Sequence, residues 1–197
     1  MKLLPYGPRA VLAEFDSLAE VMAAASAWRV AAFPDVVDVV PAARTVLVVH
    51  DAPFDRDLLR QPMAAAGTAA VGDTVTIDVV YDGEDLATVA AALEMSIDDV
   101  VQLHSAAEYE VAFCGFMPGF SYLIGLDPRL IMPRRNTPRT RVPAGSVAIA
   151  AEFSAVYPCE SPGGWHLLGR TDAPMWTEDR EPPTLLPPGT RVKFRPR

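Results

Sequence analysis

Four stretches in the second half of the chain decide how it folds: FCGFMPGFSYLIGL (113–126), PRRNTPRTRVPAGSVAIA (133–150), YPCESPGGW (157–165) and LLGRT (167–171). Glycine and proline recur in them at positions that interrupt regular structure, because glycine permits positive φ angles while proline fixes φ and has no amide hydrogen. Arg, Ser, His, Tyr and Trp occupy the gaps. We therefore expect a series of shaped turns, where binding groups usually sit on a rigid scaffold.

Length and composition are those of a soluble globular protein. The chain has 197 residues, of which 50% are hydrophobic and 21% charged, enough to bury one large core or two small ones. No apolar run approaches the ~18 residues that a membrane helix requires, and the opening MKLLPYGPRA lacks the apolar centre of a signal peptide. We expect a cytoplasmic protein that has no membrane contact.

Neither the cysteines nor the histidines form a metal-binding pattern. The two cysteines, Cys114 and Cys159, have neither metal-ligand spacing nor a disulfide framework. No His, Cys and Asp cluster has the spacing of metal ligands either. The sequence therefore predicts two free thiols and no metal.

Charge is distributed unevenly along the chain. Residues 1–111 hold 18 of the 25 acidic and 6 of the 17 basic side chains, whereas residues 112–197 hold 7 acidic and 11 basic ones. Thirteen of the 19 prolines also lie in the second part. The difference predicts two structural regions, and the acidic balance argues against a nucleic-acid partner, since phosphate contacts need a concentrated basic face.

The first region, residues 1–72, is expected to be a small α+β sandwich. A strand at 11–15 precedes a helix that Ser17 opens, with Glu20 placed to complete a capping box. Two β-rich runs then suggest a hairpin, at 36–40 and 45–50.

A second, shorter helix is expected after this hairpin. Asp55 is placed to cap it, its end is expected near Gly67, and Pro62 should kink it. The order of strand, helix, two strands, helix and strand predicts one layer of helices packed on a sheet. This region looks like scaffold.

The pattern of residues 73–197 favours a β-barrel or sandwich. A strand at 74–81 is followed by a helical run at 85–93 and by a second one that Ser96 can cap, with Asp99 at the third position. Short β segments separated by Gly/Pro turns come next, at 109–114, 146–151, 165–169 and 191–194. The fold class is therefore α+β, with a small α/β sandwich before a barrel.

The GFMPGF motif places two glycines around a proline and aromatic residues at its flanks. The glycines would let the backbone approach a ligand, while Phe116, Phe120 and Tyr122 would wall an apolar pocket with Pro118 between them. The alternative is a tight corner between a strand and a loop, packed with aromatic rings.

The basic segment that follows holds Arg134, Arg135, Arg139 and Arg141 within eight residues. Prolines stiffen its backbone, which suits guanidinium groups that bind a carboxylate or phosphate at two points. In an extended segment Arg139 and Arg141 point the same way. The alternative is a solvated basic loop.

Hydroxyl and imidazole groups follow these cations. Gly145 and Ser146 offer a backbone amide and a hydroxyl as an anion cradle. His166 could shuttle a proton, because histidine has a pKa near neutrality, or it could be structural. Trp165 and His166 face opposite ways in a strand, so only one of them should reach a given pocket.

Several familiar catalytic motifs are missing from the sequence. It contains no P-loop, no GxGxxG, no HExxH and no GxSxG nucleophile elbow. A self-contained hydrolase or ATPase is hard to build from this chain.

The order of the four stretches resembles the B subunit of the prokaryotic 5-oxoprolinase, a family also named allophanate hydrolase subunit 1 or KipI-type kinase inhibitor. The resemblance implies a cyclophilin-like β-barrel, and the missing motifs predict a chain that is inactive alone. It also implies a complex with a homologous carboxyltransferase-type C subunit and an A subunit, which opens 5-oxoproline to glutamate with ATP. The complex would bind ATP and a small carboxylate substrate. The alternatives are a regulator of a sensor histidine kinase and a component of a urea or allophanate system.

Site residues follow from the motifs that match this family. His166, Arg139 and Ser146 are the catalytic candidates. The substrate-binding candidates share these turns: Phe116, Pro118, Phe120, Arg134, Arg141, Gly145, Tyr157, Gly163, Gly164 and Trp165. The family usually carries Gly-x-Gln-Thr-Gly before its Tyr-Pro, where this chain has AEFSA (151–155). This departure lies at the expected pocket and bears on the identity of the substrate.

Overall fold

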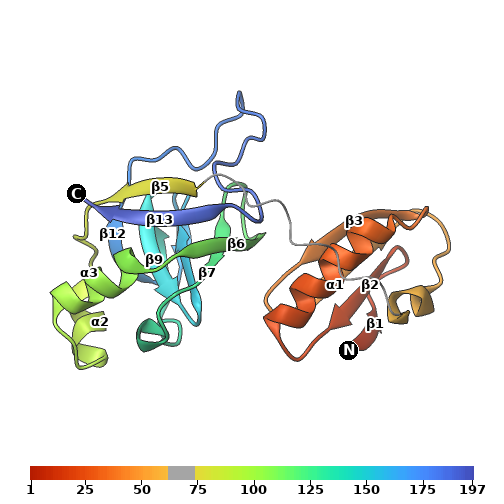
Figure 1. Ribbon diagram of the computed structural model, residues 1–197, viewed down its shortest axis with the longest axis horizontal. Coiled ribbons are helices and arrows are strands. Elements are labelled where there is room, and N and C mark those ends of the chain that lie inside the picture. The colour runs from red at the N-terminus through yellow and green to blue at the C-terminus, as the bar shows by residue number, and fades with distance from the viewer. Residues whose placement is uncertain (62–73) are drawn as a thin grey trace. The chain divides into compact units, whose positions relative to one another are not determined.

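The computed structural model describes residues 1–61 and 74–197, and the chain divides into two compact units, Met1–Ala70 and Val71–Arg197. Each unit has its own sheet (Figure 1). The expected boundary at residue 72 lies outside the described residues, as do the expected kink at Pro62 and the expected helix end near Gly67.

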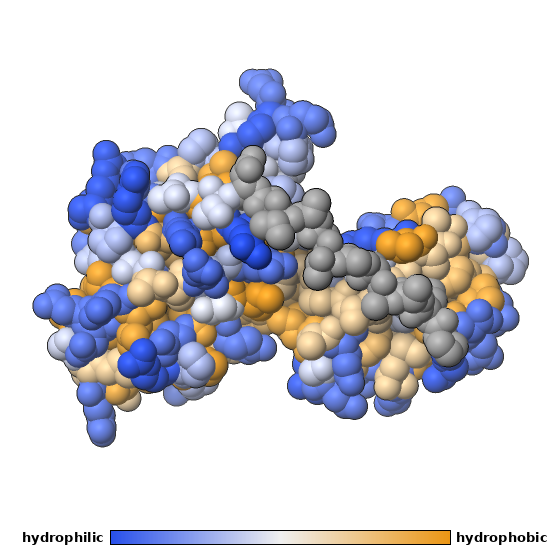
Figure 2. Space-filling view, viewed as in Figure 1, coloured by the Kyte–Doolittle hydropathy of each residue, from blue (hydrophilic) through white to orange (hydrophobic). Residues whose placement is uncertain are grey.

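The first unit is a four-stranded antiparallel sheet with one long helix against it (Figure 1). The strand order is β1 (Lys2–Pro5), β2 (Ala10–Glu14), β4 (Thr45–His50) and β3 (Val36–Pro41), and the helix is α1 (Leu18–Ala31). Alternating residues of β2 and β4 form the core with the buried face of α1. Much of the exposed surface of α1 is alanine, seen as a pale orange area in Figure 2.

The start of α1 follows from its capping residues. The Ser17 hydroxyl accepts a hydrogen bond from the Glu20 amide at 3.3 Å, as expected, whereas the Glu20 carboxylate accepts from the amide of Asp16 at 3.0 Å. Asp55 caps a 3₁₀ helix, η1 (Arg56–Arg60), where a longer helix was expected.

The second unit is built on a seven-stranded sheet that closes almost completely into a barrel (Figure 1). Its strand order is β12 (His166–Arg170), β9 (Ser146–Ala150), β10 (Phe153–Val156), β7 (Ser121–Ile124), β6 (Tyr109–Cys114), β13 (Arg191–Pro196) and β5 (Thr74–Val79). The expected fold class, α+β with a β-barrel, is confirmed.

A single bridge joins the two ends of this sheet. Val80 follows β5 and pairs with Arg170, the last residue of β12, through two backbone hydrogen bonds of 2.9 Å. Gly169 makes this approach possible, because a Cβ atom there would lie 2.4 Å from the carbonyl oxygen of Val80. The barrel core is apolar and includes Ile77, Leu123 and Ile149, which are almost fully buried.

Two short helices and a small sheet complete the second unit. The helices are α2 (Leu86–Ala92) and α3 (Ile97–Ala106), and Ser96 forms the expected capping box with Asp99 at the start of α3. A 3₁₀ turn, η2 (Pro128–Leu130), follows β7. The additional sheet pairs β8 (Arg139–Val142) with β11 (Ser161–Gly163). Among the described helices none is long and apolar enough to cross a membrane.

Candidate functional site

Three of the four glycine- and proline-rich stretches meet at a small hollow, which we call the aromatic pocket, and the fourth, residues 167–171, does not line it. The pocket has a volume of about 100 Å³. It is lined by Phe116, Phe120, Tyr122, Arg134, Tyr157, Pro162, Gly163, Gly164 and Trp165. Most of the predicted substrate-binding residues therefore lie together, although they are spread over 50 positions of the sequence.

Phe120 is the centre of the aromatic wall. Its ring lies edge-on to Phe116, Tyr157 and Trp165, with centroid distances of 5.4, 5.3 and 5.5 Å. Tyr122 adds a further contact at 5.1 Å. Edge-to-face packing of this kind fixes ring orientations and gives the pocket a rigid apolar wall.

Gly163 is required by the hydroxyl of Tyr157. A Cβ atom at residue 163 would lie 2.4 Å from that oxygen, so any side chain would displace the tyrosine. Glycine thereby lets the polar tip of Tyr157 pack against backbone at the wall of the pocket.

Phe116 stands at the rim in a strained conformation. Its φ angle is +69°, and the Met117 amide donates to the carbonyl of Gly115 at 2.8 Å, which makes a γ-turn of the rare positive-φ kind. The side chain is 61% exposed. A positive φ angle in a residue other than glycine costs free energy, and such strained residues cluster at binding sites.

Arg134 supplies the positive charge of the pocket. Among the described residues it forms no ion pair, and its side chain is exposed. Burial raises the pKa of both Tyr122 and Tyr157, and the charge of Arg134 opposes that rise. The pocket thus combines apolar rings with a guanidinium group at its wall.

Arg135 and Arg139 bind a carboxylate within the chain, at Asp85. Arg139 donates two hydrogen bonds of 2.8 Å to the Asp85 carboxylate, Arg135 donates one of 2.5 Å, and the amide of Leu167 donates another of 2.8 Å. We call this group the Asp85 clamp. Arg139 also pairs with the exposed Glu84 at 3.2 Å.

Asp85 was expected only to begin a helix. Its side chain is 3% exposed and makes no capping bond to α2, because it faces the two arginines. Burial would raise the pKa of Asp85, but the hydrogen bonds from Arg139 and Leu167 hold it below its usual range. Nothing in the local sequence distinguishes this Asp from a helix cap, so the role of Asp85 was missed.

Other predicted residues lie outside the aromatic pocket. Arg141 pairs with Glu160 at 2.6 Å, so Arg139 and Arg141 bind different carboxylates. Pro118 is exposed on its turn. Gly145 has φ of +77°, and the Ser146 hydroxyl donates to the carbonyl of Pro143 at 2.8 Å.

His166 lies beside the pocket, in β12. Trp165, which directly precedes the strand, lines the pocket and His166 does not, so only one of the two reaches the pocket, as expected. Nε2 of His166 lies 2.9 Å from the carbonyl oxygen of Pro133. Since a carbonyl only accepts, Nε2 carries the hydrogen of this contact, and the buried Nδ1 has no partner in the described structure.

The unusual segment 151–155 contributes to the core. Phe153 packs edge-on against Phe113 at 5.9 Å. The Ser154 hydroxyl lies 2.9 Å from Nε2 of the fully buried His104, whose Nδ1 lies 2.8 Å from the hydroxyl of Tyr81. Neither Phe153 nor Ser154 lines the aromatic pocket.

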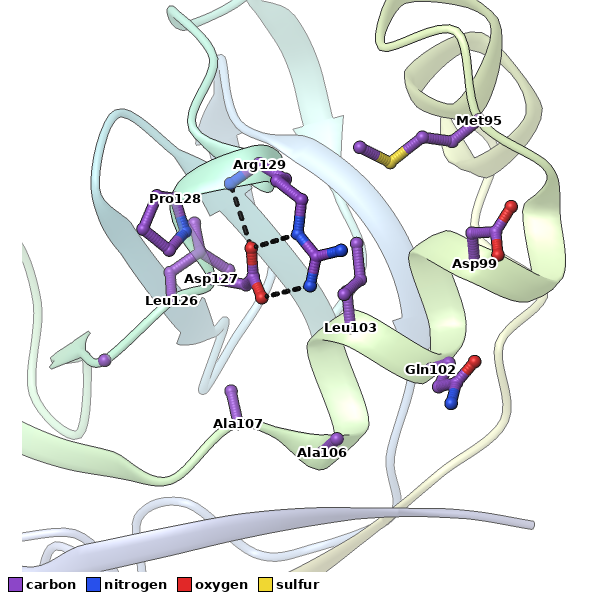
Figure 3. A pocket seen from close by; sticks show the side chains of 11 residues that line it. Met95, Asp99, Gln102, Leu103, Ala106, Ala107, Leu126, Asp127, Pro128 and Arg129 are labelled. Carbon is purple, nitrogen blue, oxygen red and sulfur yellow. Dashed lines mark hydrogen bonds and ion pairs between the residues drawn. The ribbon is translucent and has the colours of Figure 1, made fainter.

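A larger hollow, of about 620 Å³, lies between α3 and η2 (Figure 3). In its wall Arg129 is held by two hydrogen bonds to the Asp127 carboxylate, at 2.9 and 2.8 Å, and Asp99 belongs to the capping box. These charges are already partnered within the chain, so we assign the site to the aromatic pocket. Among residues 1–61 and 74–197, no group of three His, Cys, Asp or Glu side chains could hold a metal ion.

Comparison with known proteins agrees with this architecture. Residues 1–186 match the family model described as carboxyltransferase domain, subdomain C and D. The B subunit of 5-oxoprolinase from Escherichia coli O157:H7 is 37% identical over 96% of this chain and 93% of its own length. That of Bacillus subtilis is 36% identical over 82% of this chain and 76% of its own length.

Solved structures show the same fold. A conserved uncharacterized protein from Pyrococcus horikoshii superposes with a TM-score of 0.61 at 34% identity, covering 100% of this chain and 97% of its own. A longer solved protein is 37% identical and superposes with a TM-score of 0.79. The match includes 96% of this chain and 40% of the longer protein. The K. lactis urea amidolyase shares the fold, with 20% identity and a TM-score of 0.75. That match includes 99% of this chain and 15% of the urea amidolyase.

The fold and the matching family model define a carboxyltransferase-type domain. Within that class, the chain belongs to the family of the 5-oxoprolinase B subunits.

Proposed function

We propose that this chain is one component of a multi-subunit, ATP-dependent 5-oxoprolinase that opens 5-oxoproline to glutamate in the cytoplasm. The names of its relatives support the reaction. The observation that carries the proposal in this chain is the guanidinium of Arg134, which lines the aromatic pocket and has no ion-pair partner among the described residues.

The pocket matches the two chemical features of this substrate. 5-Oxoproline has a compact lactam ring and a carboxylate. Arg134 can bind the carboxylate through two parallel hydrogen bonds, while Phe120 and Trp165 cover the ring. This chain would thereby orient the substrate, and the ring opens when water adds across the lactam C–N bond and the nitrogen takes a proton.

The size of the pocket indicates that other chains complete the site. Its volume of about 100 Å³ is below the ~300–1,000 Å³ of most ligand sites. We propose that a carboxyltransferase-type C subunit and an A subunit supply the missing walls. The sequence has no phosphate-binding loop, so its residues do not fit ATP, and we assign ATP to the assembled complex.

The predicted catalytic roles of His166, Arg139 and Ser146 stay predictions. Arg139 and Ser146 are occupied by Asp85 and by the carbonyl of Pro143. His166 differs from these two residues, because its buried Nδ1 has no partner in the described structure, but it does not line the aromatic pocket.

Arg134→Ala tests the proposal. Calorimetry of the assembled subunits with 5-oxoproline should show binding weakened by about 1.5–3 kcal/mol, the value of a hydrogen bond to a charged group. Arg141→Ala removes an equally basic residue that pairs with Glu160 and should bind like the wild type. Unchanged affinity in Arg134→Ala would remove the pocket from substrate binding.

A urea-derived carboxylate is the second candidate substrate. The urea amidolyase of Lachancea kluyveri is 32% identical over 55% of this chain, although the match covers only 6% of that protein. Allophanate also carries a carboxylate that Arg134 could bind. Turnover by the assembled subunits with each substrate separates the two candidates.

A further inference from the structure

We propose that Asp85 is a positioning residue, which holds Arg134 at the mouth of the aromatic pocket through Arg135 and Arg139. Only the expected effect on 5-oxoproline binding rests on the proposed function. Asp85 lies some 50 residues before the arginines, at the start of α2, and it does not line the pocket.

The first support is the geometry of the carboxylate. Its two oxygens accept four N–H groups, three from Arg135 and Arg139 and one from the amide of Leu167. Two points along the basic segment are therefore tied to the start of α2, and the same carboxylate is tied to β12. A buried carboxylate that accepts four hydrogen bonds fixes the positions of the groups that donate them.

The second support is the connection from the clamp to the pocket. The amide of Arg135 donates to the carbonyl of Gly164 at 2.8 Å, and Gly164 lines the pocket. Nε2 of His166 contacts the carbonyl of Pro133 at 2.9 Å. Arg134 lies between these two attachment points, so its backbone is fixed on both sides although its side chain is exposed.

The third support is the charge of the clamp. One carboxylate faces two guanidinium groups, which leaves an excess of one positive charge at a largely buried position. Glu84 can offset little of this charge, because its side chain is 72% exposed. Together with Arg134, the clamp gives this side of the pocket a positive field that favours anionic ligands such as carboxylates.

Neutralising Asp85 should therefore loosen the basic segment. In Asp85→Asn, the two guanidinium groups lose their common carboxylate and repel each other. We expect hydrogen exchange of the Arg135 amide to accelerate at least tenfold, while amides of β2 and β4 in the first unit exchange as before. This measurement does not depend on the substrate.

Glu84→Gln is the matched control. It also removes a negative charge paired with Arg139, at the neighbouring position, but from an exposed side chain. Exchange of the Arg135 amide should stay within about threefold of the wild type, as expected for a weak surface pair. Equal acceleration in both variants, or none in Asp85→Asn, would overturn the proposal.

If Asp85→Asn does not fold, the double variant Asp85→Asn/Arg139→Gln replaces it. This variant removes one excess cation, so it should fold better than the single variant and still show at least tenfold faster exchange at Arg135. Normal exchange in the double variant would overturn the positioning role.

Binding then connects the clamp to the proposed function. In the assembled complex, Asp85→Asn should raise KM for 5-oxoproline at least tenfold and change kcat less, because it displaces a binding group. An unchanged KM with faster exchange at Arg135 would refute the link to Arg134. If the wild type binds no 5-oxoproline, the proposed function fails, and the exchange result still decides whether Asp85 positions the segment.

Discussion

His104 is neutral in the barrel core. It is fully buried between Tyr81 and Ser154, and burial lowers its pKa to about 3. The Ser154 hydroxyl donates to the carbonyl of Ala148, so Nε2–H of His104 donates to Ser154 and Nδ1 accepts from Tyr81. Tyr81, α3 and β10 are thereby joined through one imidazole.

This histidine should make the protein sensitive to mild acid. Its folded pKa is lowered from an unfolded value of 6.5, so its stabilisation is complete above pH 6.5 and is lost as the pH falls toward the folded value. The free energy of unfolding should fall by about 1.4 kcal/mol per pH unit below pH 6 from this group alone. Urea unfolding at pH 7.5, 6 and 5 measures the slope.

His104→Gln separates this effect from other titrations. The variant should be less stable at neutral pH, because a fitted buried ring is lost, and its stability should depend less on pH between 6.5 and 5. An unchanged slope would assign the acid sensitivity to other groups.

Arg139 should matter more for stability than its position in a basic run suggests. Arg139→Ala leaves the buried carboxylate of Asp85 with a single guanidinium partner. We expect a loss of about 3 kcal/mol, the lower end for breaking a buried pair, in chemical unfolding of the second unit. Arg141→Ala, at an exposed pair with Glu160, should change stability by no more than about 0.5 kcal/mol.

The glycine beside the barrel seam should resist substitution. In Gly169→Ala, the new Cβ would lie 2.4 Å from the carbonyl oxygen of Val80, which forces the bridge between β5 and β12 apart. We expect a loss of at least about 2 kcal/mol in thermal or chemical unfolding, within the range for strained and overpacked sites.

Gly115→Ala is the comparison for that variant. A Cβ atom there would meet only the Tyr122 ring, at an ordinary 3.8 Å, and its φ angle is not positive. Similar losses in the two variants would mean that the seam at Gly169 is not a special constraint.

Elements with local signals were predictable from the sequence. Ser17, Asp55 and Ser96 mark the starts of three helical segments, and a hydroxyl or carboxylate three residues or fewer from an amide is a local feature. Strands β8 and β11 were not predicted, because each has only three or four residues: β8 reads RTRV, with three polar residues of four, and β11 reads SPG, which contains both proline and glycine. They exist because they pair with each other.

The candidate site was predictable to a similar extent. The motifs in which aromatic residues stand next to glycine identified most of the pocket wall, because this combination of residues is uncommon. Sequence could not show that Arg139 is occupied while Arg134 lines the pocket, because the partner of Arg139 is Asp85, 54 positions away. Contacts of this length depend on barrel closure, which no local pattern encodes.

The isolated chain should be inactive without its partners. Its sequence has no nucleotide-binding loop or nucleophile elbow, and its pocket is small. We expect the purified chain to show no ATP-dependent loss of 5-oxoproline, and addition of the partner subunits to restore turnover. Turnover by the chain alone, free of other subunits, would contradict the proposed division of labour.

The position of β13 has a consequence during biosynthesis. This strand lies between β5 and β6, and its Arg195 pairs with Asp78, 117 residues earlier. Until residues 191–196 emerge from the ribosome, β5 and β6 both present open edges to other nascent chains. Closing so distant a pair is slow, so we expect the newly made second unit to rely on chaperones more than the first unit, whose strands pair with near neighbours.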